Sequence, residues 1–250
     1  MHARTGLIFH LKLFLLSFCS TIVLGNVHGP AFCAALPDSA PTRAISSFEL
    51  DFSTLSDNVR SDLADLGFSF KKEMEDDEAI RLRIKNDRLH IATPVQSVGL
   101  MVKNDLHVLR PEWLEIEWGI EQYPHGGDWH LGRKKEAVMV VLFFGDPLPS
   151  TSFYLPDVPV FLGMFLGEHE VPLQPFVSEN YGDRGRYVCV GNPRPGQMIT
   201  TRLNIPKVFH DWIGNRAMPP ITGIAIEVDT RDLSEEEVSS SAFIHHIGLQ

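Results

Sequence analysis

The stretch from residue 113 to 145 constrains the fold most, because two strong strand patterns flank one long polar loop in it. In the first part, Leu114, Ile116 and Trp118 alternate with glutamates, which is the period-two pattern of a strand with one buried face. The run from Ala137 to Phe144 is hydrophobic on both sides and predicts a central strand covered on both faces. The sequence therefore predicts a protein built on β-sheet.

Short segments of alternating hydrophobic and polar residues recur from Ser46 onward, with turn-forming residues between them. They predict further strands at residues 48–52, 68–70, 80–84, 89–91, 97–102, 160–167, 187–190, 198–205, 221–229 and 242–249. One short helix is expected from Pro206 to Ile213, because proline suits a first helical turn and Gly214 follows the end. Residues 55–66 fit a helical turn or a loop, and residues 168–186 predict a surface loop. The pattern is typical of an all-β protein, an antiparallel β-sandwich of jelly-roll type.

The start of the chain predicts export. The first 35 residues contain no Asp or Glu and lead from Arg4 and Lys12 into a hydrophobic run at residues 13–24. A membrane anchor is the alternative, but this run is shorter than the ~20 residues that a spanning helix needs. We expect a signal peptide at residues 1–35, with cleavage after Gly25 or Ala35, a linker at 36–45 and a single domain at 46–250. The expected location is periplasmic or secreted, with no membrane span after cleavage.

The charge of the chain excludes some partners. The formal net charge is −10, and loss of Arg4 and Lys12 with the signal peptide makes it −12. Nucleic acids and anionic membranes require a basic surface, so no nucleic-acid partner is expected. After cleavage at Ala35 only Cys189 remains, so no internal disulfide is expected, and its valine neighbours predict a buried thiol in a strand.

The order of several segments resembles a known family. These are GFSFKKE, SVGLMVK, LEIEWGIE, EAVMVVLFFG, PPITGIAIEVDT and FIHHIGL, spread over residues 46–249. Together they resemble the exported bacterial proteins known as domain of unknown function 3047. That resemblance implies a jelly-roll, galactose-binding-like module and an exported protein. It implies no activity, because the family has no settled one.

Two polar segments contain the candidate ligand-binding residues. Aromatic side chains in loops stack on sugar rings, and neighbouring polar groups hydrogen-bond hydroxyls. The alternative is that aromatic residues in these loops, and Tyr154 in another, cover the ends of the sandwich without binding a ligand. The candidates are Tyr123, His125, Asp128, Trp129 and His130 in the first segment and Tyr181, Asp183 and Arg184 in the second.

Metal binding is a further hypothesis, although no cofactor is the main expectation. His125, Asp128 and His130 are spaced as divalent-metal ligands can be, and such spacings also arise by chance in loops. Asp229 and Thr230, together with Asp232, offer oxygen ligands for calcium, or form a turn that satisfies backbone amides.

No nucleophile or phosphate-binding motif is present: the sequence contains neither GxSxG nor a glycine-rich phosphate loop. The expected function is that of an exported, non-catalytic binding protein of the bacterial cell envelope, which recognises a saccharide or an envelope polymer. One alternative is a periplasmic glycan-active hydrolase or lyase, for which Asp128 and Glu136 are the carboxyl groups to test. Another is a protein-binding subunit of an envelope complex.

Overall fold

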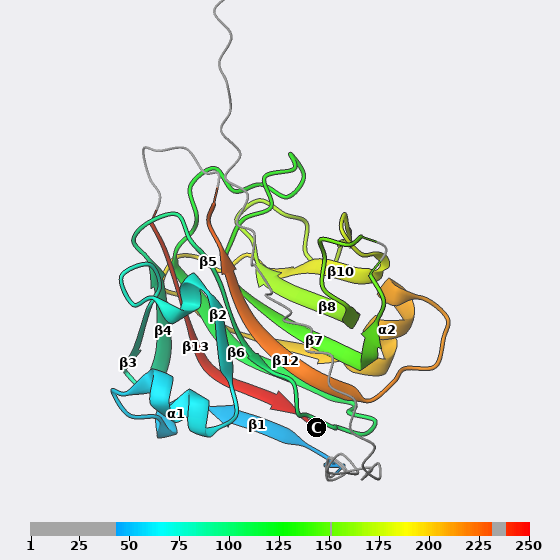
Figure 1. The fold of residues 1–250 in the computed structure, drawn as a ribbon. Helices are drawn as coiled ribbons and strands as arrows, with labels where there is room; N and C mark the ends of the chain where they lie inside the picture. Colours follow the sequence, from blue (N-terminus) through cyan, green and yellow to red (C-terminus); the bar gives the residue numbers. More distant parts are fainter. Residues whose placement is uncertain (1–43, 151, 232–238) are drawn as a thin grey trace, which may run out of the picture. The chain divides into compact units, whose positions relative to one another are not determined.

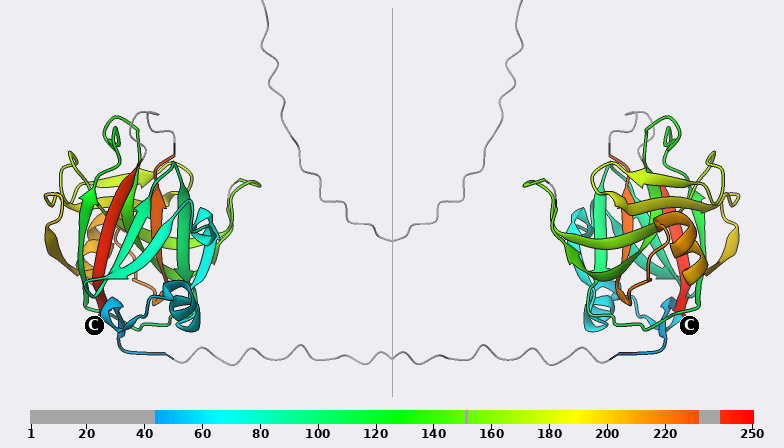
Figure 2. Two further views of the ribbon diagram at one scale, coloured as in Figure 1. Left: turned by 90° about the vertical axis from the view of Figure 1, so that its left-hand side faces the viewer. Right: turned by 90° about the vertical axis from the view of Figure 1, so that its right-hand side faces the viewer.

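The computed structural model describes residues 44–150, 152–231 and 239–250. In this part of the chain two β-sheets pack face to face, as Figures 1 and 2 show. The antiparallel β-sandwich of jelly-roll type predicted from the sequence is therefore confirmed. The predicted signal peptide and most of the predicted linker lie outside the described residues. Ile45, at the end of that linker, already donates its backbone N–H to His107 O at 2.9 Å.

The first sheet contains six strands in the order β11-β6-β13-β4-β3, with β1 pairing along part of β13. All of its pairs are antiparallel. The side chains of Ile116, Trp118 and Ile120 point from β6 into the core, as their alternation predicted. Trp118 is fully buried, and its Nε1 donates to Thr201 Oγ1 at 3.0 Å. The strands are β1 (Phe48–Asp51), β3 (Arg81–Lys85), β4 (Arg88–Thr93), β6 (Trp113–Gln122), β11 (Met198–Asn204) and β13 (Ser240–Leu249).

The second sheet contains seven strands in the order β2-β5-β12-β7-β8-β10-β9. Neighbouring strands in this sheet are antiparallel except for β8 and β10, which are parallel. After β8, the chain returns through β9 and its flanking loops before β10 begins, so β10 runs in the same direction as β8. The strands are β2 (Ser69–Lys72), β5 (Val98–Lys103), β7 (Glu136–Leu148), β8 (Val158–Leu166), β9 (Pro175–Ser178), β10 (Gly182–Gly191) and β12 (Ile221–Asp229). Residues 168–186, predicted as a surface loop, therefore contain β9 and the start of β10, and that prediction was wrong in this part. The reason is that pairing with β8 and β10 is a tertiary contact, which polar local sequence does not reveal.

Two α-helices and two 3-10 turns complete the described fold: α1 (Val59–Asp65), α2 (Ile205–Ile213), η1 (Phe52–Thr54) and η2 (Glu73–Glu75). The structure thus decides residues 55–66 in favour of a short helix. The helix predicted at Pro206–Ile213 is confirmed as α2, and Asn204 caps it by accepting from Lys207 N at 3.0 Å. Its Phe209 packs on Phe144 of β7, with ring centroids 4.9 Å apart. None of the helices in the described residues has the length and hydrophobicity to cross a membrane.

Both faces of the seven-stranded sheet are hydrophobic, which sets up the site described below. On β7, Val138, Val140 and Leu142 belong to the main core between the sheets. Met139 and Val141 point to the outer face, where a second cluster forms around them. The prediction that this strand is central and covered on both sides is confirmed, since loop and strand side chains rather than a third layer cover its outer face.

Candidate ligand-binding site

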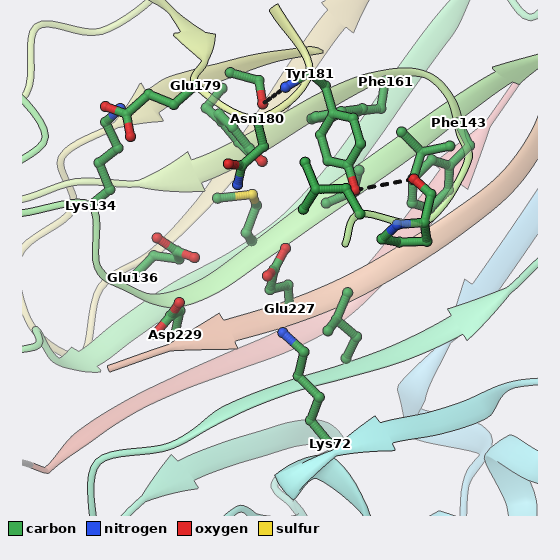
Figure 3. Close-up of a pocket in the computed structure, with 18 of the residues that line it drawn as sticks. Lys72, Lys134, Glu136, Phe143, Phe161, Glu179, Asn180, Tyr181, Glu227 and Asp229 are labelled. Atoms are coloured by element: carbon green, nitrogen blue, oxygen red, sulfur yellow. Dashed lines mark hydrogen bonds and ion pairs between the residues drawn. The ribbon is translucent and has the colours of Figure 1, made fainter. Parts of the chain in front are cut away.

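A pocket with a volume of about 490 Å³ lies on the outer face of the seven-stranded sheet (Figure 3). Its floor is the second hydrophobic cluster, and its rim comes from the loop before β7, the loop before β8 and the β9–β10 turn. One part is aromatic and aliphatic, and the other carries charged groups. The residues of the aromatic part are Trp129, Phe143, Phe161, Tyr181 and Tyr187, and those of the charged part are Lys72, Glu136, Glu227, Asp229 and Arg231.

A β-bulge turns Glu136 toward this pocket. Asp229 pairs with Glu136, and Glu227 pairs with Met139, so β7 has one extra residue opposite β12 at this point. Ala137 and Val138 both point into the core, which shifts the alternation by one position. Without the bulge, Glu136 would share the inward face of Val138 and Val140, and an unpaired carboxyl would enter the core. The bulge thus converts a core position into a pocket position.

Trp129 covers the floor from the loop between β6 and β7. Its indole is 5% exposed and stacks on Phe165 with a centroid distance of 4.6 Å, while Phe176 and Tyr187 contact it at tilted angles. The buried carboxylate of Glu170 fixes the loop, because Glu170 Oε1 accepts from Trp129 N at 2.9 Å. Trp129 therefore lines the pocket and also packs within the hydrophobic cluster that forms its floor.

Two buried polar atoms of the pocket residues have no hydrogen-bond partner among the described residues. They are Nε1 of Trp129, a donor, and Oε2 of Glu136, an acceptor when ionised. Glu136 is 4% exposed. A buried polar group without a partner costs about 1–3 kcal/mol, so groups of this kind often mark a place where a ligand supplies the missing bond.

Asp229 is held as a carboxylate. Arg231 Nη2 contacts Asp229 Oδ2 at 2.7 Å, and Lys135 Nζ lies 3.6 Å from Asp229 Oδ1. Burial alone would raise the pKa of Asp229, but the hydrogen bonds from Arg231 and the charge of Lys135 outweigh burial and hold the pKa below its ordinary value.

The pKa values of Glu136 and Glu227, the two glutamates next to Asp229, are shifted in the opposite direction. Burial, followed by the negative charges of Glu227 and Asp229, raises the pKa of Glu136 well above its ordinary value. Burial and the charge of Asp229 raise the pKa of Glu227 to about 7, although Lys72 and Arg231 lower it. Among these three groups, neutral pH therefore favours an ionised Asp229, a protonated Glu136 and a Glu227 close to half ionised.

Of the eight residues proposed from the sequence, Trp129 and Tyr181 line this pocket. The ring of Tyr181 meets Phe161 edge-on with centroids 5.9 Å apart, and its hydroxyl donates to Pro156 O at 3.4 Å (Figure 3). Tyr123 instead packs against the core and donates its hydroxyl to Pro193 O at 2.8 Å. The structure therefore separates the two tyrosines that the sequence had grouped.

The polar candidates of the first loop lie away from the pocket lining. Asp128 Oδ1 accepts from Leu131 N at 3.0 Å and shapes the turn that presents Trp129. His130 is exposed, accepts from Val171 N at 3.4 Å through Nε2, and meets Phe176 edge-on. His125 is exposed near the start of the loop. Asp128 and His130 thus support the loop that carries Trp129, and none of the three residues lines the pocket.

In the second segment, Asp183 and Arg184 hold structure together. Asp183 has a side chain that is 97% exposed and pairs with Arg186 at 3.2 Å. Arg184 Nη1 donates to Leu148 O at 3.2 Å and to Pro149 O at 2.6 Å, which ties β10 to the end of β7. Tyr154, the remaining loop aromatic, is 91% exposed.

The residues suggested for metals are used in other ways. Within the described residues, no group of three or more His, Cys, Asp or Glu side chains is placed to hold a metal ion. Thr230 is fully buried and its Oγ1 accepts from Ser97 N at 3.0 Å, as the turn interpretation predicted. Asp232 lies outside the described residues. Cys189 is a buried thiol in β10, as predicted, and burial raises its pKa.

Sequence reasoning missed Glu227 and Tyr187 and gave Glu136 only a secondary place. A signal for Glu227 existed, since a charged residue interrupts the hydrophobic strand Ile221–Asp229 on the side opposite to Ile224, Ile226 and Val228. No local signal indicated Glu136, because its orientation depends on the bulge against β12.

Comparison of the sequence with known protein families and with curated proteins gives no match. Among solved structures, the fold is similar to the winged bean acidic lectin in complex with methyl-α-D-galactose, with 9% identity and a TM-score of 0.36. That alignment covers 82% of this chain and 99% of the lectin. A structure of an endo-1,4-β-xylanase from Trichoderma reesei is similar with 11% identity and a TM-score of 0.28, over 67% of this chain and 91% of the xylanase. At these values neither likeness supports an argument about the ligand or the activity of this chain.

Proposed function

We propose that this protein is an exported saccharide-binding protein of the bacterial cell envelope and that its ligand occupies the pocket on the seven-stranded sheet. The observation that carries the proposal is the pairing of aromatic surface with unsatisfied buried polar groups in one cavity. A sugar presents C–H faces that stack on aromatic rings and hydroxyls that both donate and accept hydrogen bonds. Trp129 Nε1 and Glu136 are the groups that such hydroxyls would satisfy.

The volume and construction of the pocket also favour a small ligand or one unit of a polymer. A volume of about 490 Å³ lies within the usual range for ligand sites, and the floor stands on strands rather than on loops. The formal net charge of −10 disfavours an anionic saccharide. The proposed ligand is therefore a neutral oligosaccharide.

Saccharide binding is expected to depend on the indole N–H of Trp129. A panel of neutral oligosaccharides is screened by thermal shift, and the dissociation constant of any stabilising saccharide is then measured by calorimetry. Trp129→Phe keeps an aromatic ring in the wall but removes the donor, and should weaken binding about 10-fold, which is the size of one hydrogen bond. Leu131→Ala, in the same loop and 70% exposed, should bind as the wild type does.

Two results would count against this proposal. One is the failure of every saccharide in the panel to raise the melting temperature of the wild type. The other is equal affinity in Trp129→Phe and the wild type.

Export is proposed on the basis of the first 35 residues, which combine a basic start with a hydrophobic run and lack acidic residues. Mass spectrometry of the protein recovered from a bacterial periplasm or culture medium is expected to give a chain that begins after Gly25 or Ala35. Recovery of the intact chain with Met1 from the cytoplasm would contradict this prediction. A variant with Leu15 and Leu16 replaced by arginine should keep its signal peptide and stay inside the cell, because the hydrophobic run is broken.

A further inference from the structure

Three carboxyl groups come together in the charged part of the pocket. Glu136 lies opposite Asp229 across the β7–β12 pair, and Glu227 precedes Asp229 by two residues on the same face of β12. Opposite residues in an antiparallel pair have Cβ atoms about 5 Å apart, and diagonal neighbours have Cβ atoms about 7–8 Å apart. Figure 3 shows the carboxyl groups gathered at the floor, with Lys72 reaching toward Glu227 from β2. One sugar unit can therefore contact both Glu136 and Glu227.

A second observation indicates that a ligand belongs here. Glu136 is more than nine-tenths buried, and its Oε2 has no partner among the described residues. Trp129 comes from a different element, lines the same pocket and also buries an unpartnered polar atom. The bulge positions Glu136 and the hydrogen bond to Glu170 positions Trp129, so the fold itself places both residues in the pocket lining.

We propose that the pocket hydrolyses a glycosidic bond of a neutral oligosaccharide, with Glu136 as the proton donor and Glu227 as the proton acceptor. This inference rests on the proposed function, because the oligosaccharide must first bind in the pocket. The proton of Glu136 moves to the glycosidic oxygen as the bond from that oxygen to the anomeric carbon breaks. A water molecule forms the new bond to the anomeric carbon and gives its proton to the carboxylate of Glu227. One water is consumed, and exchange with solvent restores the proton of Glu136 and removes that of Glu227.

The surrounding charges assign these two roles. Glu136 faces Glu227, Asp229, Lys135 and Arg231, and burial, followed by the negative charges of Glu227 and Asp229, opposes its ionisation. Arg231 and Lys135 keep Asp229 ionised, so Asp229 is a positioning residue that preserves the proton of Glu136. A carboxyl group that stays protonated at neutral pH is the form required of a general acid.

Glu227 faces Asp229, Lys72, Arg231 and the hydroxyl of Tyr187. Its pKa of about 7 places it near the operating pH, where a general base is most effective. Water attack requires the two carboxyl groups to lie about 6.5–9.5 Å apart, and a diagonal pair of strand residues, with Cβ atoms about 7–8 Å apart, permits this separation. The rate is expected to fall as pH drops below about 7, when Glu227 gains a proton, and again at higher pH, when Glu136 loses its proton.

The test compares two kinds of substrate on the full mature protein. Neutral oligosaccharides of glucose, galactose, xylose, mannose and N-acetylglucosamine have leaving groups that need a proton, whereas the matching 2,4-dinitrophenyl glycosides do not. Glu136→Gln should lower kcat/KM for the oligosaccharide by about 100-fold or more but change that for the dinitrophenyl glycoside by less than about 10-fold. Glu227→Gln should slow both, because water activation is required in each. Glu117→Gln, a strand glutamate on the outer face of the other sheet, should behave as the wild type.

The outcomes separate this inference from the proposed function. An oligosaccharide that binds with a measurable dissociation constant but yields no reducing ends with the wild type overturns hydrolysis and leaves saccharide binding in place. Absence of both binding and cleavage removes both proposals. Equal slowing of both substrates in a folded Glu136→Gln protein overturns the role of Glu136 as acid. An unsaturated product replaces hydrolysis by elimination and likewise overturns the inference.

Discussion

At pH 8, Glu227→Gln is expected to unfold with a free energy about 3 kcal/mol higher than that of the wild type, because a pKa raised from 4.5 to about 7 costs about 1.4 kcal/mol per unit. The folded-state pKa of Glu227 is raised to about 7, so its contribution to stability is fully present below the ordinary pKa near 4.5 and is lost as pH rises through 7. Glutamine keeps the shape of the side chain and never ionises, so it avoids the cost of burying a charge next to Asp229. Urea unfolding at pH 8 and at pH 4.5 measures the effect, and the two proteins should be equally stable at the lower pH.

Glu179→Gln is a control in which the pKa shift of the replaced residue has the opposite sign. Glu179 is an exposed carboxylate whose pKa lies below its ordinary value, because Lys134 hydrogen-bonds it at 2.6 Å. Its stabilising contribution is present above its ordinary pKa and is lost as pH falls through its folded value. The variant should therefore be no more stable than the wild type at pH 8. Equal urea midpoints for Glu227→Gln and the wild type at pH 8 would show that Glu227 bears no burial cost.

Trp129→Ala is expected to lower the free energy of unfolding by about 3–5 kcal/mol, the usual cost of truncating a buried aromatic residue in a packed cluster. The indole is 5% exposed and contacts the rings of Phe165, Phe176 and Tyr187, so its loss leaves a cavity in the outer-face cluster. Binding measurements on this variant would mix instability with loss of a ligand contact. For that reason Trp129→Phe serves as the binding probe and Trp129→Ala as the stability probe.

Trp113→Ala is the matched control for that measurement. Trp113 is half-buried at the start of β6, and its main described contact is with Arg202, whose guanidinium lies 4.5 Å from its ring centroid. A contact of this kind contributes about 0.5–1 kcal/mol at an exposed site, so the control should lose far less stability than Trp129→Ala. Equal losses in chemical denaturation would mean that the outer-face cluster contributes little to the fold.

The pocket lies on a sheet face rather than among the loops at an end of the sandwich. Most of its floor stands on β7, β8, β10 and β12, whose inner faces form the main core. Rigid strands hold side chains in place more closely than loops do, so the positions of Glu136, Glu227 and Tyr187 vary little once the sandwich has formed. The loop with Trp129 closes one side, and the carboxylate of Glu170 ties that loop to the neighbouring segment.

The sequence by itself determined the fold class, because alternation on β6 and β12 reports local side-chain periodicity that a strand cannot avoid. It also determined the helix at Pro206–Ile213, which the structure extends by Ile205, and the burial of Cys189, since helix-end signals and hydrophobic neighbours act over a few residues. The sequence also identified Trp129 and Tyr181, which line the pocket, because large aromatic side chains are conspicuous in polar segments.

Only the tertiary structure decided which polar residues meet. Glu136 and Glu227 are 91 positions apart in the numbering, and one extra residue in β7 opposite β12 turns Glu136 from the core face to the pocket face. Asp128 accepts from a backbone N–H inside its own turn, and Arg184 donates to the backbone O of Pro149, 35 residues away, so neither role could be predicted from local sequence. Local sequence patterns show which residues of a strand share a face. The register and the bulges between strands determine which side chains meet, and these arise only when the sheets assemble.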